Sequence, residues 1–217
     1  MFLFLILLTI ILLCGCSSKF DLSELSKLGK IAITSESSYQ IVYVPSPFAK
    51  DSEKEEIVGY LENILEEFPL AQILRQKIYN AMTSAYTLNL VDDSVVEKLG
   101  KRSLQDFIFW AKKNNLQAII HLESIIEISH VYRIHSLPLK NYPKIWTKVK
   151  IIKVESGEII WIKRVWTHMF DGTIFEVKSS SVYGNVVERK ELEFLIHKKI
   201  DYIVNSILKS FTFKHTT

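Results

Sequence analysis

The sequence predicts an α+β domain in which amphipathic helices pack on a single mixed sheet. Apolar residues recur at helical spacing in residues 70–85 and 189–211, which favours two helices that each pack one face on a core. Residues 144–168 alternate around a glycine turn, as an antiparallel hairpin does. The predicted elements follow in the order β-α-β-α-β-β-β-α, which excludes an all-α or an all-β fold.

The first third of the domain is expected to contain a strand followed by two helices. Residues 30–34 (KIAIT) are typical of a strand, and residues 40–44 of a second short strand or its continuation. Residues 52–68 favour a helix, because acidic residues in the first turn complement the helix dipole. Pro69 suits the first turn of the next helix. The inward face of that helix is expected to consist of Leu70, Ile73, Leu74, Ile78, Ala81, Met82 and Ala85.

The middle of the chain favours a strand, two helices and another strand. Residues 86–91 are expected to form a strand, residues 92–93 a turn, and residues 94–99 a short helix. Residues 103–114 predict a further helix that ends at an Asn-Asn pair. Residues 117–128 follow as a strand whose centre (AIIHL) is nearly all apolar, as expected of a strand covered on both faces.

The C-terminal half contains the clearest strand pattern and a final helix. The first strand of the 144–168 hairpin presents two different faces, one with Thr147, Val149 and Ile151 and the other with Trp146, Lys148 and Lys150. This alternation predicts a half-solvated antiparallel hairpin that turns at residues 155–158. Residues 189–211 predict one long amphipathic helix that lies across the sheet.

The N-terminus of the chain resembles a bacterial lipoprotein signal peptide. An uncharged apolar run ends in Leu13-Cys14-Gly15-Cys16. This segment resembles the lipobox, which has an aliphatic residue three positions before the lipidated cysteine and a small residue directly before it. A stable transmembrane helix needs about 20 apolar residues, and this run is shorter. Its length is typical of a signal-peptide core, which has roughly 7 to 15 residues.

Processing at this signal would divide the chain into three segments. We expect residues 1–15 to be a cleaved signal peptide, residues 16–29 a tether lipidated at Cys16, and residues 30–217 a single domain. Several acyl chains hold a protein at a membrane, because each buried methylene contributes about 0.8 kcal/mol. Ser17 follows the lipidated cysteine, and in enterobacterial lipoproteins a residue other than Asp at this position resembles the signal for transfer to the outer membrane. We therefore expect the protein to be anchored at the periplasmic face of the outer membrane.

Two alternatives stay open, because no Lys or Arg stands before Lys19. One is an N-terminal anchor that is never cleaved, and the other is a start codon placed downstream of the true one. The cysteine count favours the lipoprotein, since Cys14 and Cys16 are the two cysteines of the chain. Cleavage removes one and acylation uses the other, so the mature domain is expected to have no disulfide and no thiol chemistry.

Composition and motifs argue against several classes of function. The hydrophobic content of 48% and the aromatic content of 12% exclude a disordered chain. A formal net charge of +3 gives no strong footprint for nucleic acid. No phosphate-binding loop, Gly-x-Ser-x-Gly motif or His-Glu-x-x-His motif occurs in the sequence. We therefore expect neither an enzyme nor a cofactor.

Two groups of polar residues have ordinary explanations. The tightest histidine pair, His130 and His135, has no Cys partner and no convincing third ligand, so we expect no metal site. Asp92 and Asp93 are adjacent, so their side chains would point apart, and Asp is a common turn former. We interpret this acidic pair as part of a turn and expect no catalytic residue there.

The element order and two short motifs resemble a group of bacterial envelope proteins. Gln117–Leu122 (QAIIHL) and Val154–Trp161 (VESGEIIW) stand where that group has Ala-Asp-Tyr-Val-Ile-x-Gly and Val-x-Thr-Gly-Glu-Val. The group contains the N-terminal domain of TolB, the curli secretion lipoprotein CsgG and the lipoprotein LpoB, which activates penicillin-binding proteins. Gln117 and His121 depart from the Asp and Gly of the usual segment. The resemblance implies a TolB N-terminal-domain-like fold and a non-enzymatic adaptor that binds envelope proteins through sheet edges and loops.

The candidate partner surface lies in the hairpin and in the segment before it. Residues 129–143 form a long connection between predicted strands, and long loops on a rigid scaffold often carry function. Trp146 shares a strand face with basic residues, and Tyr and Trp are enriched at binding hot spots. We expect a cell-envelope protein to bind Tyr132, Arg133, Tyr142, Trp146 and Lys148.

The alternative function is an oligomeric secretion or pore subunit similar to CsgG. A membrane-spanning hairpin needs about 9 to 11 residues per strand with one face apolar. In the second strand of the hairpin, Ile160, Arg164 and His168 share one face and Lys163 lies on the other. Neither face is cleanly apolar, which argues against a pore.

Overall fold

The computed structural model describes residues 19–44, 51–100, 102–131, 140–167 and 189–212. In chain order the elements are β1 (Phe20–Asp21), α2 (Leu22–Leu28), β2 (Ile31–Val44), α3 (Asp51–Glu67), α4 (Leu70–Ala85), α5 (Asp93–Glu97), α6 (Leu104–Lys113), β3 (Ala118–Val131), β4 (Lys140–Lys153), β5 (Ile159–Trp166), α7 (Arg189–Leu208) and β6 (Phe211–Thr212). None of the described helices is long and apolar enough to cross a membrane.

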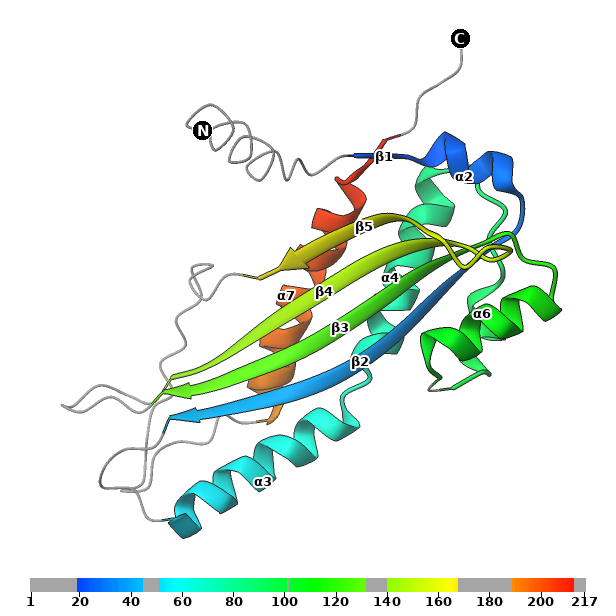
Figure 1. The fold of residues 1–217 in the computed structure, drawn as a ribbon. Coiled ribbons are helices and arrows are strands. Elements are labelled where there is room, and N and C mark those ends of the chain that lie inside the picture. Colours follow the sequence, from blue (N-terminus) through cyan, green and yellow to red (C-terminus); the bar gives the residue numbers. More distant parts are fainter. Residues whose placement is uncertain (1–18, 45–50, 101, 132–139, 168–188, 213–217) are drawn as a thin grey trace, which may run out of the picture.

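A four-stranded mixed sheet forms the centre of the domain. Its strand order is β2-β3-β4-β5, with β2 parallel to β3 and the other two pairs antiparallel. A parallel pair needs a crossover connection, and here the chain segment that contains α3 to α6 makes it. Helices α4 and α7 lie side by side across one face of the sheet (Figure 1). The predicted fold class, an α+β domain with one mixed sheet, is therefore confirmed.

The main core lies between this inner face of the sheet and the helices. Buried residues from β3 and β4 meet the apolar stripes of α4 and α7, and the alternation predicted for β4 is confirmed because Thr147, Val149 and Ile151 point inward. The buried residues of α7 are Leu192, Leu195, Ile196, Ile200, Ile203, Val204 and Ile207. The predicted long helix thus packs across the sheet as expected.

The domain begins earlier than the sequence analysis expected. Helix α2 lies within the expected tether, residues 16–29, yet its Leu22 and Leu25 are fully buried in the main core. Just before it, Phe20 in β1 pairs with Phe211 in β6, so the two ends of the described chain are joined. The boundary expected at residue 30 is therefore corrected to Phe20. The apolar residues of α2 were too few to be recognised as a stripe.

The strand predicted for residues 86–91 is wrong. Within it, Leu88 N donates to Tyr86 O at 3.1 Å and Leu90 N donates to Leu88 O at 3.0 Å, a pattern of tight turns in place of a strand ladder. The segment contacts the sheet through one isolated parallel bridge, between Leu90 and Ile31. Asn89 O accepts from Ile31 N at 2.9 Å and Val91 N donates to Ile31 O at 2.8 Å, but the tight turns before this bridge prevent a continuous strand.

Both ends of the long loop predicted for residues 129–143 are strand, at residues 129–131 and 140–143. Ser129, His130 and Val131 extend β3 and pair with Tyr142, Asn141 and Lys140 of β4. Residues 31–34 and 40–44 belong to one continuous strand, β2, so the second predicted segment is a continuation of the first. The sheet is therefore longer than predicted at this end.

Candidate functional site on the open face of the sheet

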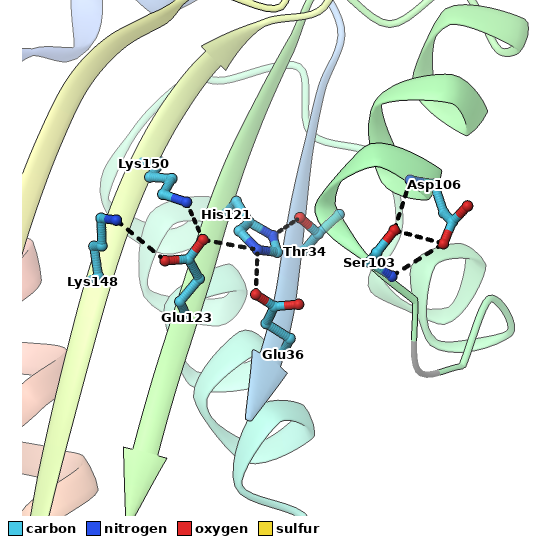
Figure 2. A network of polar contacts seen from close by, with 8 residues as sticks. All are labelled: Thr34, Glu36, Ser103, Asp106, His121, Glu123, Lys148 and Lys150. Carbon is cyan, nitrogen blue, oxygen red and sulfur yellow. Dashed lines mark hydrogen bonds and ion pairs between the residues drawn. The ribbon is translucent and has the colours of Figure 1, made fainter. Parts of the chain in front are cut away.

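The outer face of the sheet changes in character from one end to the other. At one end it is covered by α5 and α6, and Ala32, Ile119 and Phe107 belong to a second, smaller apolar core there. Helix α6 starts at a capping box, in which Ser103 and Asp106 exchange hydrogen bonds (Figure 2). Beyond α6 the side chains of four strands form cross-strand rows. We call this uncovered part the open face.

Three cross-strand rows of side chains make up the open face. Register pairing places Thr34, His121, Lys150 and Ile162 in the first row, Glu36, Glu123, Lys148 and Arg164 in the second, and Ser38, Ile125, Trp146 and Trp166 in the third. The first row is polar apart from Ile162, and every residue of the second is charged, so we call the second row the charged row. The third row is apolar apart from its serine. Cross-strand neighbours of this kind lie close enough to interact directly.

A buried histidine is the centre of the polar rows. The His121 side chain has no exposed surface, and its Nδ1 lies 2.8 Å from Thr34 Oγ1. Its Nε2 lies 3.5 Å from Glu36 Oε1 and 3.9 Å from Glu123 Oε1 and has no hydrogen-bond partner (Figure 2). The Phe107 ring of α6 lies 5.9 Å from the imidazole. Burial lowers the pKa of His121, and the two carboxylates oppose this only in part, so the ring stays neutral.

Two lysines neutralise the carboxylate of Glu123. Lys150 Nζ donates to Glu123 Oε1, and Lys148 Nζ lies 3.5 Å from Oε2 (Figure 2). Partial burial acts to raise the pKa of Glu123, but the hydrogen bond and charge of Lys150, together with the charge of Lys148, lower it overall. At neutral pH this cluster therefore contains paired charges around a neutral imidazole.

Glu36, His121 and Glu123 also have the donor types of a metal site. Their ligand atoms lie within 4.8 Å of one another, and they are the one such group in the part of the chain that the structure describes. The sequence analysis, which expected no metal site, did not identify this group. Both oxygens of Glu123 already face an ammonium group, so a divalent ion would have to enter against two positive charges. The lysines account for the charge of the site, and we assign no metal to it.

The third row is an exposed apolar surface. Ile125 is 41% exposed, and Trp146 and Trp166 are each 44% exposed. The two indole rings lie 6.0 Å apart at an angle of 31°. Ile125 and Trp166 flank Trp146 on neighbouring strands, so the three side chains form one strip across β3, β4 and β5. We call these three residues the aromatic row.

The structure assigns different places to the five predicted partner-binding residues. Trp146 and Lys148 lie on the open face as predicted, with Lys148 in the charged row beside the aromatic row. Tyr142 belongs to β4 and pairs with Ser129. Tyr132 and Arg133 lie outside the described residues, as does Cys16. Binding by all five residues stays a prediction.

Sequence reasoning missed Ile125, Glu36 and Glu123 as members of this surface. A signal was present, because polar residues stand two apart in both Thr34–Glu36 and His121–Glu123, as they do on one face of a strand. The acidic pair, which was expected to form a turn, lies at the start of α5. Asp92 caps α5 by accepting from Ser94 N at 2.9 Å, and Asp93 pairs with the buried Arg75 at 2.6 Å.

Gln117 and His121, the two residues that differ from the motif of the similar envelope proteins, do not distort the backbone at β3. His121 pairs regularly with Thr34 on one side and Lys150 on the other, and its φ is not positive. Gln117 has a local structural role, since its Oε1 accepts from Lys30 N at 2.7 Å and its Nε2 donates to Asn115 O at 2.8 Å.

No family model and no curated protein matches the chain. Among solved structures it is similar to the LpoB C-terminal domain from Salmonella enterica, at 14% identity and a TM-score of 0.32, over 64% of this chain and 82% of that chain. It is also similar to a putative neuraminyllactose-binding hemagglutinin homolog from Helicobacter pylori, at 8% identity and a TM-score of 0.39, over 88% of each chain. A lipoprotein from Neisseria meningitidis shares 10% identity at a TM-score of 0.34, over 82% of this chain and 98% of that chain.

A solved LpoB domain is thus among the similar structures, whereas the resemblance to TolB and CsgG stays a prediction. At identities and TM-scores this low, the likenesses assign neither a family nor a function to this chain.

Proposed function

We propose that the chain is a bacterial lipoprotein, anchored by lipid on Cys16, that acts as a non-enzymatic adaptor and binds another cell-envelope protein through its open face. The observation that supports this is the aromatic row, because three large apolar side chains are left exposed beside one another on a rigid sheet. Contiguous exposed apolar surface is typical of protein interaction sites, and Trp is the residue type most enriched at binding hot spots.

The surroundings of the aromatic row suit a protein partner. Binding energy concentrates in central apolar side chains that are surrounded by polar residues. Here the charged row flanks one side, and the ion pair of Lys144 with Glu127, at 2.7 Å, flanks the other. In the charged row Lys148 is paired with Glu123, whereas Arg164 has no ion pair with a described residue. A partner with an apolar centre and an acidic rim would match this pattern.

The anchor and the partner can be tested together in membranes of the native host. A palmitate analogue is expected to label the wild type and not Cys16→Ala. Crosslinking and mass spectrometry of the labelled protein are expected to give one reproducible crosslink to another envelope protein. Unchanged labelling of Cys16→Ala would contradict the lipid anchor, and crosslinks to the chain alone would favour the CsgG-like oligomer.

The role of the aromatic row needs a separate comparison of variants. Trp146→Ala combined with Trp166→Ala removes the two rings, and we expect the heterologous crosslink to be lost. The matched control is Phe109→Ala, because Phe109 is an exposed aromatic residue of α6 that lies outside the row. Each hot-spot ring contributes 2 kcal/mol or more in typical interfaces, so affinity for the partner should fall by at least about 30-fold per ring. An unchanged crosslink would exclude this surface.

A further inference from the structure

The position of β1, the first described element, limits how far the domain can stand from a lipidated Cys16. Phe20 N donates to Ser210 O at 2.9 Å, and the Phe20 ring lies 5.7 Å from that of Trp161. Phe20 is therefore already packed on the domain, and it lies four residues after Cys16 in the sequence. Four fully extended residues span at most about 14 Å. The surface around β1 must consequently lie against any membrane into which Cys16 is anchored.

A basic basin lies on this part of the surface. It is a shallow cavity of about 460 Å³ between β5 and α7, close to the entry of the chain into β1. Lys19, Lys163, Arg164 and Lys209 line it, and Tyr202 and Trp166 lie at the same site. These cations come from the N-terminal segment, β5 and the residue after α7, so the fold and not the local sequence brings them together.

The charges of the basin are not balanced within the described chain. No Asp or Glu occurs among its lining residues, and none of its four cations forms an ion pair with another described residue. Lys148 and Lys150 of the open face differ from these cations, because both of them face Glu123. A cluster of unpaired cations creates a positive potential that favours an external anion.

Two aromatic residues indicate which kind of anion would bind to the basin. Tyr202 and Trp166 are each 44% exposed at the basin. Tyr and Trp side chains have an apolar body and a polar group, which is why they are enriched where a protein meets the headgroup region of a bilayer. Basic residues close to a surface of anionic lipids each contribute about 1 kcal/mol, a factor of about five in affinity.

We propose that the basic basin rests on the anionic surface of the membrane and binds lipid phosphate headgroups between β5 and α7. This inference extends the proposed function, since the position of the basin at the membrane rests on the lipid anchor at Cys16. The β1 end of the domain then lies on the bilayer, and the anchor fixes both the distance and the orientation of the open face. Arg164 and Trp166 border both surfaces, whereas Lys163 and Lys209 belong to the basin alone.

The test uses residues 17–217, which contain every described element and lack Cys16, so that acylation cannot contribute. Flotation is measured with phosphatidylcholine vesicles that contain or lack phosphatidylglycerol, at low salt. The wild type is expected to float with the anionic vesicles and to remain unbound to the neutral ones. Lys163→Gln combined with Lys209→Gln should weaken binding by about 30-fold.

The matched control is Lys112→Gln combined with Lys113→Gln, because these exposed lysines of α6 lie outside the basin and change the net charge equally. It should retain binding within about fivefold. Equal losses in the two double variants, or no flotation of the wild type with anionic vesicles, would overturn the proposal. The proposal would also be overturned if inorganic phosphate saturated the basin while the protein did not bind to anionic vesicles. A failed palmitate labelling would leave this flotation result unchanged, so the two proposals fail separately.

Discussion

The two faces of the central sheet use the same strands for different purposes. Along β3, Leu122 and Ile126 point inward and are buried, whereas Ile125 points outward and is 41% exposed. The inner face is closed by α4 and α7, and the open face keeps a charged network and the aromatic row uncovered. The apolar residues on the open face are therefore available for binding.

The largest expected effect comes from comparing two isoleucines of the same strand. Ile120→Ala removes a fully buried side chain from the main core, and we expect the free energy of unfolding to fall by about 3 kcal/mol. Ile125→Ala truncates a side chain of the open face and should cost less than about 1 kcal/mol. Urea unfolding of both variants measures the difference. Similar losses would contradict the assignment of the two faces.

The inner face contains a polar pair that extends this comparison. Ser124 Oγ and Thr147 Oγ1 lie 3.0 Å apart, and both side chains are buried. Either Ser124→Ala or Thr147→Val leaves a buried hydroxyl without its partner, so each should cost about 1 to 2 kcal/mol. The double variant removes both hydroxyls and should cost less than the sum of the two. Additive losses in a double-mutant cycle would mean that the pair is not coupled.

The sequence predicted the inner face better than the open face, for a physical reason. Alternation within one strand placed Thr147, Val149 and Ile151 on one face, because side chains of a strand alternate between its two faces, and the structure buries all three. The network around His121 depends on pairing between strands instead. His121 and Thr34 are 87 residues apart in the sequence, and no local pattern specifies their register.

Two local errors have related causes. Helix α2 was missed because Leu22 and Leu25 are too few to indicate a stripe, although tertiary packing buries both of them. The strand predicted for residues 86–91 has strand-like residues, but tight turns at Tyr86 and Leu88 limit its pairing with β2 to a single bridge. In both cases the neighbouring chain, and not intrinsic propensity, decides the conformation.

The boundary between the covered and the open part of the outer face depends on α6. Ser103 Oγ accepts from Asp106 N at 3.3 Å, and Asp106 Oδ2 accepts from Ser103 N at 3.2 Å. Ser103→Ala removes the cap and should lower the free energy of unfolding by about 1 kcal/mol. The control Ser84→Ala changes an exposed serine in the last turn of α4 and should cost about 0.5 kcal/mol or less. Thermal or urea unfolding compares them, and equal effects would exclude a capping role.

The smallest effect at neutral pH is that of His121, and it grows on acidification. Burial keeps the pKa of His121 in the folded protein below its ordinary value of about 6.5. Below that pH the unfolded chain binds a proton that the folded protein excludes, so the free energy of unfolding should fall. Glu36, Glu123 and Lys150 face the ring, and the two carboxylates reduce this loss without removing it.

Urea unfolding between about pH 8 and pH 5 measures the pH dependence, in a range where Glu123 stays ionised because its pKa is lowered. His121→Gln should make the profile flatter below about pH 6.5. His197→Gln is the control, since His197 is exposed on α7 and far from this network in sequence. A profile that His121→Gln leaves unchanged would mean that the imidazole accepts a proton in the folded state, with Glu36 and Glu123 as its counter-ions. In that case the open face would carry one more positive charge at low pH, and partner binding would depend on pH for the same reason.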